Sequence, residues 1–209
     1  MNTGIRLPAG LLIITWFLTT SPALGEVTLC DRLASHPSDP DRVTAGVQRA
    51  DIDLAAAEAA CHENIVTRPG SARARYQMGR VLYYQDKVEE SLKHLEIAAD
   101  IGYPQAIFVL GYLHVEGKAP RDPCKAARLW RRSAGLDHPW TGYYLVKHVL
   151  DGTFDDCDLE LEHTDLERYL AIARDQLSVS ESNGQVEALT ERLAARRPAA
   201  SSAGAPASR

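Results

Sequence analysis

Histidine and acidic side chains are the residues of this chain whose types could support metal binding. The chain has seven histidines among its 209 residues. His62 and Glu63 begin like the zinc motif HExxH, but Val66 stands where the second histidine would be. The acidic cluster at 155–158, DDCD, lacks the spacing of oxygen ligands that an EF-hand calcium loop requires. We therefore predict no metal site and no cofactor.

Motifs for nucleophilic catalysis or phosphate binding are absent from the sequence. It has no GxSxG elbow, no P-loop and no dinucleotide fingerprint. His94, His114 and His148 fall on partly apolar helix faces, where a packed or half-exposed histidine is the simpler interpretation. We therefore predict no catalytic residue and interpret the chain as non-enzymatic.

The four cysteines, Cys30, Cys61, Cys124 and Cys157, could form two disulfides. No two of them form a CxxC pair, which argues against a thioredoxin-type redox site and against a zinc ribbon. Four cysteines allow three pairings, so connectivity stays open at this point. We favour the pairing of neighbours, in which each bond closes a loop of roughly thirty residues. The alternative is four free buried thiols.

The first 25 residues have the pattern of a cleaved signal peptide. Arg6 precedes a short apolar run at 11–18, and the small residues Ala23 and Gly25 follow it, spaced as signal peptidase requires. The apolar run is about half the ~20 residues of a membrane-spanning helix, which favours cleavage over an anchor. We therefore expect no membrane span in the chain after signal removal.

Export determines where the cysteines would lie. A lipoprotein anchor at Cys30 is the less favoured alternative, because the residue before it, Leu29, is not small. A cleaved chain would be periplasmic or secreted, in an oxidising compartment where disulfides persist.

The composition narrows the class of protein further. Hydrophobic residues make up 45% of the chain, as in ordinary globular proteins. The formal net charge is −5 at pH 7, so the chain lacks the basic footprint that nucleic acids or anionic membranes attract. We therefore expect neither kind of partner.

Internal repetition organises the middle of the chain. Residues 91–106 align without a gap with residues 126–141, and Gly79 corresponds to Gly111. Apolar residues recur at three- and four-residue steps, so each unit is predicted to be a helical hairpin that buries its apolar face against its neighbours. Glycine inside a helix costs about 1 kcal/mol relative to alanine, so these two glycines predict close helix approach. The sequence predicts an all-α fold, an α-solenoid of about three stacked hairpins at 71–103, 104–138 and 139–178.

The predicted helix boundaries follow from the same units. The first helices begin near 71, 104 and 139, and their partners are expected at 86–101, 123–135 and 160–177. Asp86 is a predicted N-cap, and Gly102 suits the left-handed residue that ends a helix.

Residues 104–139 resemble the SEL-like repeat, a branch of the tetratricopeptide-like class. The matching residues are Ala106, Leu110-Gly111, Gly117, Lys125-Ala126, Trp130 and Ser133-Ala134. His114 stands where a tyrosine is usual and Asp137 where a glycine is usual. The third unit has Val146 in place of the helix glycine, so its fit is weaker. The resemblance covers about 70–155 and implies a helical repeat protein, without fixing what it binds.

In this repeat class the first helix of each hairpin lines a concave groove, so the resemblance implies which residues would bind a partner. These are Arg73, Tyr76, Arg80 and Tyr83; Gln105, Phe108 and Tyr112; and Trp140, Tyr143 and Lys147. Aromatic residues and arginine commonly anchor interfaces, and an extended peptide or a helix with acidic groups could lie there. The alternative is that Tyr76, Phe108 and Tyr143 only pack between repeats.

The segments that flank the repeats complete the predicted organisation. The repeat domain, 50–183, begins with an alanine-rich helix at 52–66. The flanks are predicted to be an irregular leader at 26–49, a capping helix at 184–196 and a disordered tail at 197–209.

The functional hypothesis is an exported, non-catalytic repeat protein that binds a protein or peptide, as scaffold or regulator of an envelope partner. One alternative is an enzyme, for example one directed at peptidoglycan. It would need paired carboxylates, and the groove positions contain none. The other alternative is a purely structural bridge within a larger complex.

Overall fold

The computed structural model describes residues 26–177 and 184–196, and within them the chain is helical and contains no strand. The helices are α1 (Leu29–Ala34), α2 (Leu54–Thr67), α3 (Ala72–Tyr84), α4 (Val88–Ile101), α5 (Pro104–Val115), α6 (Pro123–Ala134), α7 (Pro139–Leu150), α8 (His163–Gln176) and α10 (Gln185–Ala195), with a short 3-10 helix at Arg49–Asp51. The predicted signal peptide at 1–25 and tail at 197–209 lie outside the described residues. No helix in the described ranges is long and apolar enough to cross a membrane.

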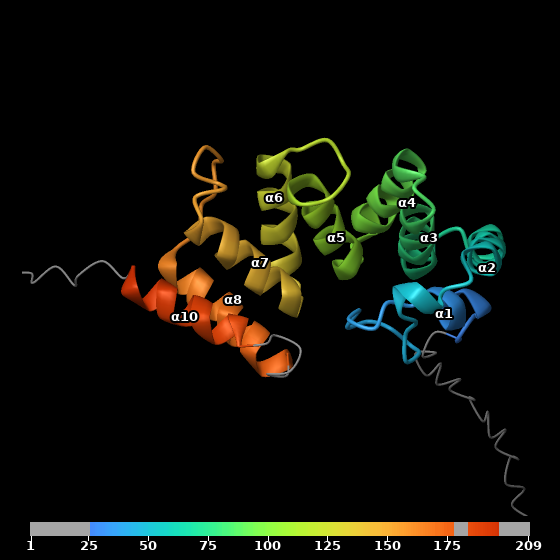
Figure 1. Cartoon of the computed structure of the whole chain (residues 1–209), viewed down its shortest axis with the longest axis horizontal. Coiled ribbons are helices and arrows are strands. Elements are labelled where there is room, and N and C mark those ends of the chain that lie inside the picture. The colour runs from blue at the N-terminus through green and yellow to red at the C-terminus, as the bar shows by residue number, and fades with distance from the viewer. Residues whose placement is uncertain (1–25, 178–183, 197–209) are drawn as a thin grey trace, which may run out of the picture.

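The helices stack in chain order, as Figure 1 shows from α2 at one end to α8 and α10 at the other. Helix α3 packs on α4, α5 on α6 and α7 on α8, which makes three hairpins in the described part of the chain. Each hairpin also packs on the next, through α4 with α5 and α6 with α7, and α10 covers α7 and α8. The predicted all-α solenoid of helical hairpins is confirmed.

Local signals explain where the helices begin and end. Prolines occupy the first turn of α5, α6 and α7, where the missing amide costs no hydrogen bond. Gly102 ends α4 in the left-handed region, with φ 104°, as expected. The prediction that Asp86 caps α4 is wrong. The N-cap is Lys87, which makes no side-chain capping bond, while Asp86 lies at φ 66° in the tight α3–α4 turn and pairs with Lys118.

Close backbone approach holds each hairpin together. A Cβ on Gly79 would stand 2.7 Å from Cγ of Leu95, and one on Gly111 would stand 2.3 Å from Nε1 of Trp130. In the third hairpin the contact lies one turn nearer the N-terminus of its helix, at Gly142, where a Cβ would stand 2.4 Å from the Tyr169 carbonyl oxygen. This shift explains why Val146 can replace the repeat glycine.

Buried apolar residues form three clusters, one for each layer of the array. The first joins α1, α2 and α3, the second joins α3, α4 and α5, and the third runs from α5 to α10. Trp130, which is 0% exposed, belongs to the third cluster. Each layer therefore completes the core of the layer beside it, which is the packing that a solenoid requires.

Both disulfides join neighbouring cysteines. Cys30–Cys61 links α1 to α2 with a Cα–Cα distance of 4.6 Å, and Cys124–Cys157 links α6 to the loop after α7 with 5.2 Å. Of the three possible connectivities, the structure has the favoured one. The alternative of free thiols is wrong, because all four cysteines are bonded.

The leader at 26–49 is more ordered than predicted, because it contains α1. A capping box starts this helix: the side chain of Thr28 accepts from the Asp31 amide, and the side chain of Asp31 accepts from the Thr28 amide. Residues 35–48, here called the strap, then run beside α3 to the short 3-10 helix (Figure 1).

Candidate binding pocket

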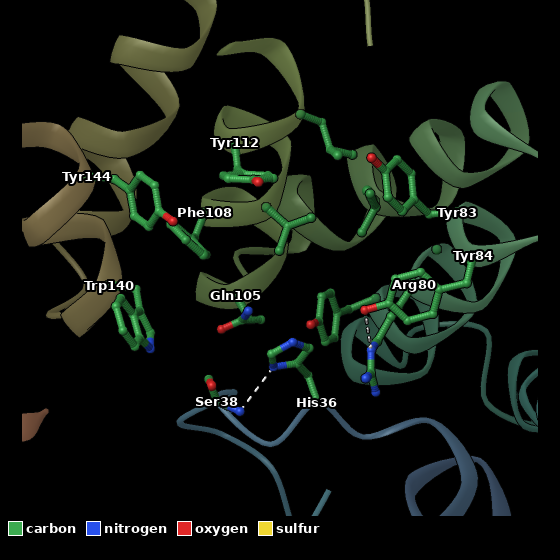
Figure 2. A pocket seen from close by; sticks show the side chains of 15 residues that line it. His36, Ser38, Arg80, Tyr83, Tyr84, Gln105, Phe108, Tyr112, Trp140 and Tyr144 are labelled. Carbon is green, nitrogen blue, oxygen red and sulfur yellow. Dashed lines mark hydrogen bonds between the residues drawn. The ribbon is translucent and has the colours of Figure 1, made fainter. Parts of the chain in front are cut away.

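A pocket of about 300 Å³ lies between α3, α5, α7 and the strap. Figure 2 shows Trp140, Phe108 and Tyr144 on one side of it, Tyr83, Tyr84 and Arg80 on the other, and His36 and Ser38 on the strap. The residues that line it are His36, Ser38, Tyr76, Gly79, Arg80, Tyr83, Tyr84, Leu95, Gln105, Phe108, Val109, Tyr112, Leu113, Trp140 and Tyr144.

Seven of the ten predicted groove residues lie together on this pocket. They are Tyr76, Arg80, Tyr83, Gln105, Phe108, Tyr112 and Trp140. They come from α3, α5 and α7, the first helices of the three hairpins, where three- and four-residue spacing places side chains on one face. Tyr76 is only 1% exposed, so this ring packs between repeats and presents little surface to the pocket.

Arg73 does not line the pocket, because it binds α1. Its Nε donates to Oδ1 of Asp31 at 2.7 Å, and Nη2 donates to Oδ2 at 3.2 Å. Burial would raise the pKa of Asp31, but hydrogen bonds from Arg73, Thr28 and Gln77 outweigh it and hold the pKa below its ordinary value. Arg73 therefore anchors the leader.

Tyr143 and Lys147 also lie outside the lining. The ring of Tyr143 packs edge-on against Trp140 and Tyr144 and is 9% exposed, which agrees with a packing role. The ammonium of Lys147 lies 3.6 Å from a carboxylate oxygen of Glu116 and 3.6 Å from one of Asp151.

Arg80 lines the pocket, but its donors face the strap. Nη1 donates to the carbonyls of Ala34 and Ser35 at 3.0 and 2.8 Å, and Nη2 donates to the carbonyl of Val47 at 2.7 Å. Nε donates to the hydroxyl of Tyr84 at 3.3 Å. The guanidinium fork thus clamps both ends of the strap to α3.

The strap supplies a wall of the pocket that the sequence did not predict. The Ser38 amide donates to Nδ1 of His36 at 3.0 Å. Burial, and then the charges of Arg80 and Arg42, lower the pKa of His36 to about 4, so the ring is neutral at pH 7. Contacts between segments so far apart in the chain leave no periodic signal in the sequence.

Asp39 is a second anchor of the strap. Its carboxylate accepts from the Tyr103 hydroxyl at 2.7 Å and from the Asp41 amide at 3.0 Å, and the residue is 0% exposed. Burial raises the pKa of Asp39 to about 6, although the hydrogen bond from Tyr103 acts in the opposite direction. The strap is therefore tied to the α4–α5 turn as well as to α3.

Two other lining residues could have been found from helical register alone. Tyr84 lies four residues after Arg80, and Tyr144 lies four residues after Trp140, so each shares a face with a predicted groove residue. On α5 the predicted residues Gln105, Phe108 and Tyr112 all line the pocket, and on α3 the prediction included Tyr83 but not Tyr84, the residue directly after it. On α7 the prediction followed Tyr143 instead of Tyr144.

The strap brings His36, Ser38 and Asp39 close in sequence, but their geometry is not that of a catalytic triad. His36 accepts the backbone amide of Ser38, and the Asp39 carboxylate faces Tyr103. None of the residues lining this pocket is an aspartate or glutamate. The described residues contain no group of three or more metal-ligand side chains. The surface offered by the pocket is mainly one of aromatic rings.

Gln105 is held in the pocket wall by a buried histidine. Nε2 of His138 donates to Oε1 of Gln105 at 2.7 Å, and Nδ1 accepts from the Thr141 amide at 3.3 Å as the N-cap of α7. Burial lowers the pKa of His138 to about 3, so the ring stays neutral and keeps one donor and one acceptor.

Three tyrosine hydroxyls complete the polar side of the pocket. Those of Tyr83, Tyr112 and Tyr144 form no hydrogen bond within the part of the chain that the structure describes. Burial raises the pKa of Tyr112, and it raises that of Tyr144 to about 12. These two hydroxyls are therefore neutral at pH 7 and can donate to a ligand.

Comparison with models of known protein families and with curated proteins finds no match. Among solved structures, the chain is similar to the crystal structure of a Sel1 repeat protein from Oxalobacter formigenes, with 18% sequence identity and a TM-score of 0.49. The similarity covers 65% of this chain and 95% of that chain. The helices of this chain and their contacts form the hairpin array that the SEL-like resemblance implies.

Proposed function

We propose that this chain is an exported, non-catalytic repeat protein that binds a protein or peptide partner at the aromatic pocket. The observation that carries the proposal is the gathering of Phe108, Tyr112, Trp140 and Tyr144 around one opening, from two successive hairpins. Aromatic side chains are the residues that most often anchor protein interfaces. In the same pocket the guanidinium of Arg80 and Oε1 of Gln105 are hydrogen-bonded within the fold, and tyrosine hydroxyls supply donors, an arrangement suited to binding.

The two disulfides support the proposed location. Both bonds are of the kind that persists in oxidising compartments such as the periplasm or the extracellular space. The partner would then be a protein of the cell envelope or of the surroundings, and this chain would act on it as a scaffold or regulator.

Site-specific crosslinking in the producing cell tests this proposal. A photoreactive phenylalanine analogue at Tyr112 should capture a protein that the same analogue at Ile97 does not capture. Ile97 is 41% exposed on α4 and is not part of the pocket, so it is a matched control.

Purified components then decide whether the pocket is the binding site. Tyr112→Ala should weaken binding of the captured protein about tenfold or more and leave the melting temperature unchanged. Equal capture from both positions, or binding that Tyr112→Ala leaves intact, would reject the proposal. Substrate turnover without any captured partner would favour the enzyme alternative.

A further inference from the structure

We infer that the pocket takes an uncharged aromatic side chain from an extended segment of the partner, whose backbone carbonyls accept from tyrosine hydroxyls at the rim. This inference rests on the proposed function and names the chemistry of the ligand. It replaces the expectation of an acidic partner, because the cations on which that expectation depended are engaged elsewhere.

The charge balance of the pocket argues against an acidic ligand. Arg73 is paired with Asp31, and Lys147 lies between Glu116 and Asp151. The donors of Arg80 face three backbone carbonyls and one hydroxyl. A carboxylate that entered would find neutral hydroxyl donors but no free cation among these groups, so its charge would stay uncompensated, which is costly. The net charge of −5 would also repel an acidic segment as it approaches.

A cationic ligand is disfavoured for a related reason. The ring of Tyr83 already has Lys118 Nζ at 5.9 Å from its centroid, and the ring of Tyr84 has Arg49 and Arg80 at 4.9 and 5.3 Å. No aspartate or glutamate lines the pocket to offset a further positive charge. A charged side chain of either sign would therefore enter without meeting a free group of opposite charge.

The rings on the α5–α7 side fit an aromatic guest. The centroid of Tyr144 lies 5.5 Å from that of Phe108 and 5.7 Å from that of Tyr112, the second pair meeting edge-on. A further ring can join such a cluster in the stacked or edge-on geometries that aromatic pairs prefer. A volume of about 300 Å³ is at the small end for ligand sites, suited to one large side chain and its backbone.

The hydroxyls specify a peptide rather than an isolated ring. Those of Tyr83, Tyr112 and Tyr144 come from three different helices and form no hydrogen bond within the described residues. Figure 2 shows these three rings spread across the pocket from the α3 side to the α7 side. Donors spread in this way can meet carbonyls at different points along an extended chain, and those carbonyls otherwise would be desolvated without partners.

Capped tripeptides provide the probe. The purified protein with both disulfides formed is titrated with N-acetyl-Ala-Phe-Ala-amide while the indole N–H of Trp140 is followed by NMR. The indole N–H of Trp130, which is buried and donates to the Phe108 carbonyl at 2.9 Å, is followed as a second signal and should shift less. The Phe peptide should shift the Trp140 signal saturably. Peptides with Glu or Lys in place of Phe should bind at least about tenfold more weakly than the Phe peptide. The peptide with cyclohexylalanine in that place should bind several-fold more weakly.

Variants separate the hydroxyl from the ring. Tyr112→Phe keeps the ring and should weaken the Phe peptide several-fold, whereas Tyr112→Ala should weaken it about tenfold or more. Ile97→Ala should leave it unchanged. If Tyr112→Ala lowers the melting temperature, the comparison of Tyr112→Phe with the unmodified protein still decides the role of the hydroxyl.

Two results would overturn the inference. One is a Glu or Lys peptide that binds as tightly as the Phe peptide, and the other is a Phe peptide that leaves the Trp140 signal unmoved. If crosslinking at Tyr112 still captures a specific partner, the proposed function stands and only the ligand chemistry is wrong. If neither experiment gives binding at the pocket, the inference and the proposed function are both rejected.

Discussion

At Gly111 the backbone of α5 lies against the indole of Trp130, and a Cβ would stand 2.3 Å from Nε1. Trp130 is 0% exposed and donates to the Phe108 carbonyl, so the indole has little room to move away. Gly111→Ala should therefore lower the free energy of unfolding by about 1–3 kcal/mol, even though alanine is the better helix former. Urea unfolding monitored by circular dichroism measures this loss.

The matched control for that substitution is Gly70→Ala. A Cβ on Gly70 meets nothing within 4 Å, so this change should alter the free energy of unfolding by less than about 0.5 kcal/mol. Similar losses in the two variants would show that close helix approach at Gly111 is not what stabilises the hairpin.

His138 gives a prediction about pH. Burial lowers its pKa to about 3, against about 6.5 for a free histidine. As the pH falls below 6.5 the unfolded chain takes up a proton that the folded chain does not, so stability is lost in that range. Between pH 7 and pH 5 this group should cost about 2 kcal/mol of unfolding free energy. His138→Asn keeps a side chain that can cap α7. The unfolding free energy that is lost between pH 7 and pH 5 should be about 2 kcal/mol smaller in this variant than in the unmodified protein.

The slope of the unfolding free energy against pH, compared between the protein and the His138→Asn variant, isolates His138 from other titrating groups. His36, with its pKa near 4, acts in the same direction, and Asp39, with its pKa near 6, acts in the opposite one. Both are present in the protein and in the variant, so they cancel in the difference between the two. An unchanged slope in His138→Asn would mean that the ring is charged in the folded state.

Among the elements, the strap depends most on a single side chain. Arg80 reaches the carbonyls of Ala34, Ser35 and Val47 with one planar fork, a geometry that a lysine ammonium cannot reproduce. Arg80→Lys should keep the charge but raise the hydrogen exchange rate of the Val47 amide about tenfold or more. That amide donates to the Ser35 carbonyl at 2.8 Å, inside the clamped region.

Arg32→Lys is the control for the strap, because Arg32 is exposed on α1. It should leave exchange at Val47 unchanged. If Arg80→Lys also leaves that exchange unchanged, other anchors such as Asp39 with Tyr103 are sufficient to hold the strap. If Arg80→Lys loosens the strap, ligand binding at the pocket should also weaken, since His36 and Ser38 form one wall of the pocket.

The hairpin helices could be predicted from the sequence because each carries its own signals. Pro104 and Pro139 mark helix starts, Gly102 marks an end, and the apolar spacing marks the buried face. Helix α1 has only six residues, and beyond its capping box it depends on the bond of Cys30 to Cys61 and on the partners of Asp31 in α3. Such distant contacts leave no local pattern.

The same limit explains which site residues could be predicted. Helical spacing placed Phe108 and Tyr112 on one face of α5, and both line the pocket. Spacing also placed Arg73 beside Tyr76, but it could not reveal that Asp31 binds that arginine. The sequence therefore predicts the face of a helix, while the partners that reach it from other segments determine what remains free.

At the scale of the whole molecule, the array has a disulfide near each end. Cys30–Cys61 stabilises the layer of α1, α2 and α3, and Cys124–Cys157 joins α6 to the loop after α7. In a solenoid each layer contacts its neighbours only, so the effect of a lost disulfide should stay local. Bonds that span 31 and 33 residues should each contribute about 3–4 kcal/mol on the chain-entropy model.

The double substitution Cys30→Ala with Cys61→Ala tests this local coupling. Hydrogen exchange should increase in α1 and the strap, which lose their covalent link to α2, while α7 and α8 keep their protection. Cys124→Ala with Cys157→Ala should show the reverse distribution and serves as the matched control. Because the strap forms a wall of the pocket, the first pair should also weaken peptide binding more than the second. Uniform loss of protection in both variants would mean that the array unfolds as one cooperative unit, so that neither disulfide acts on its own layer.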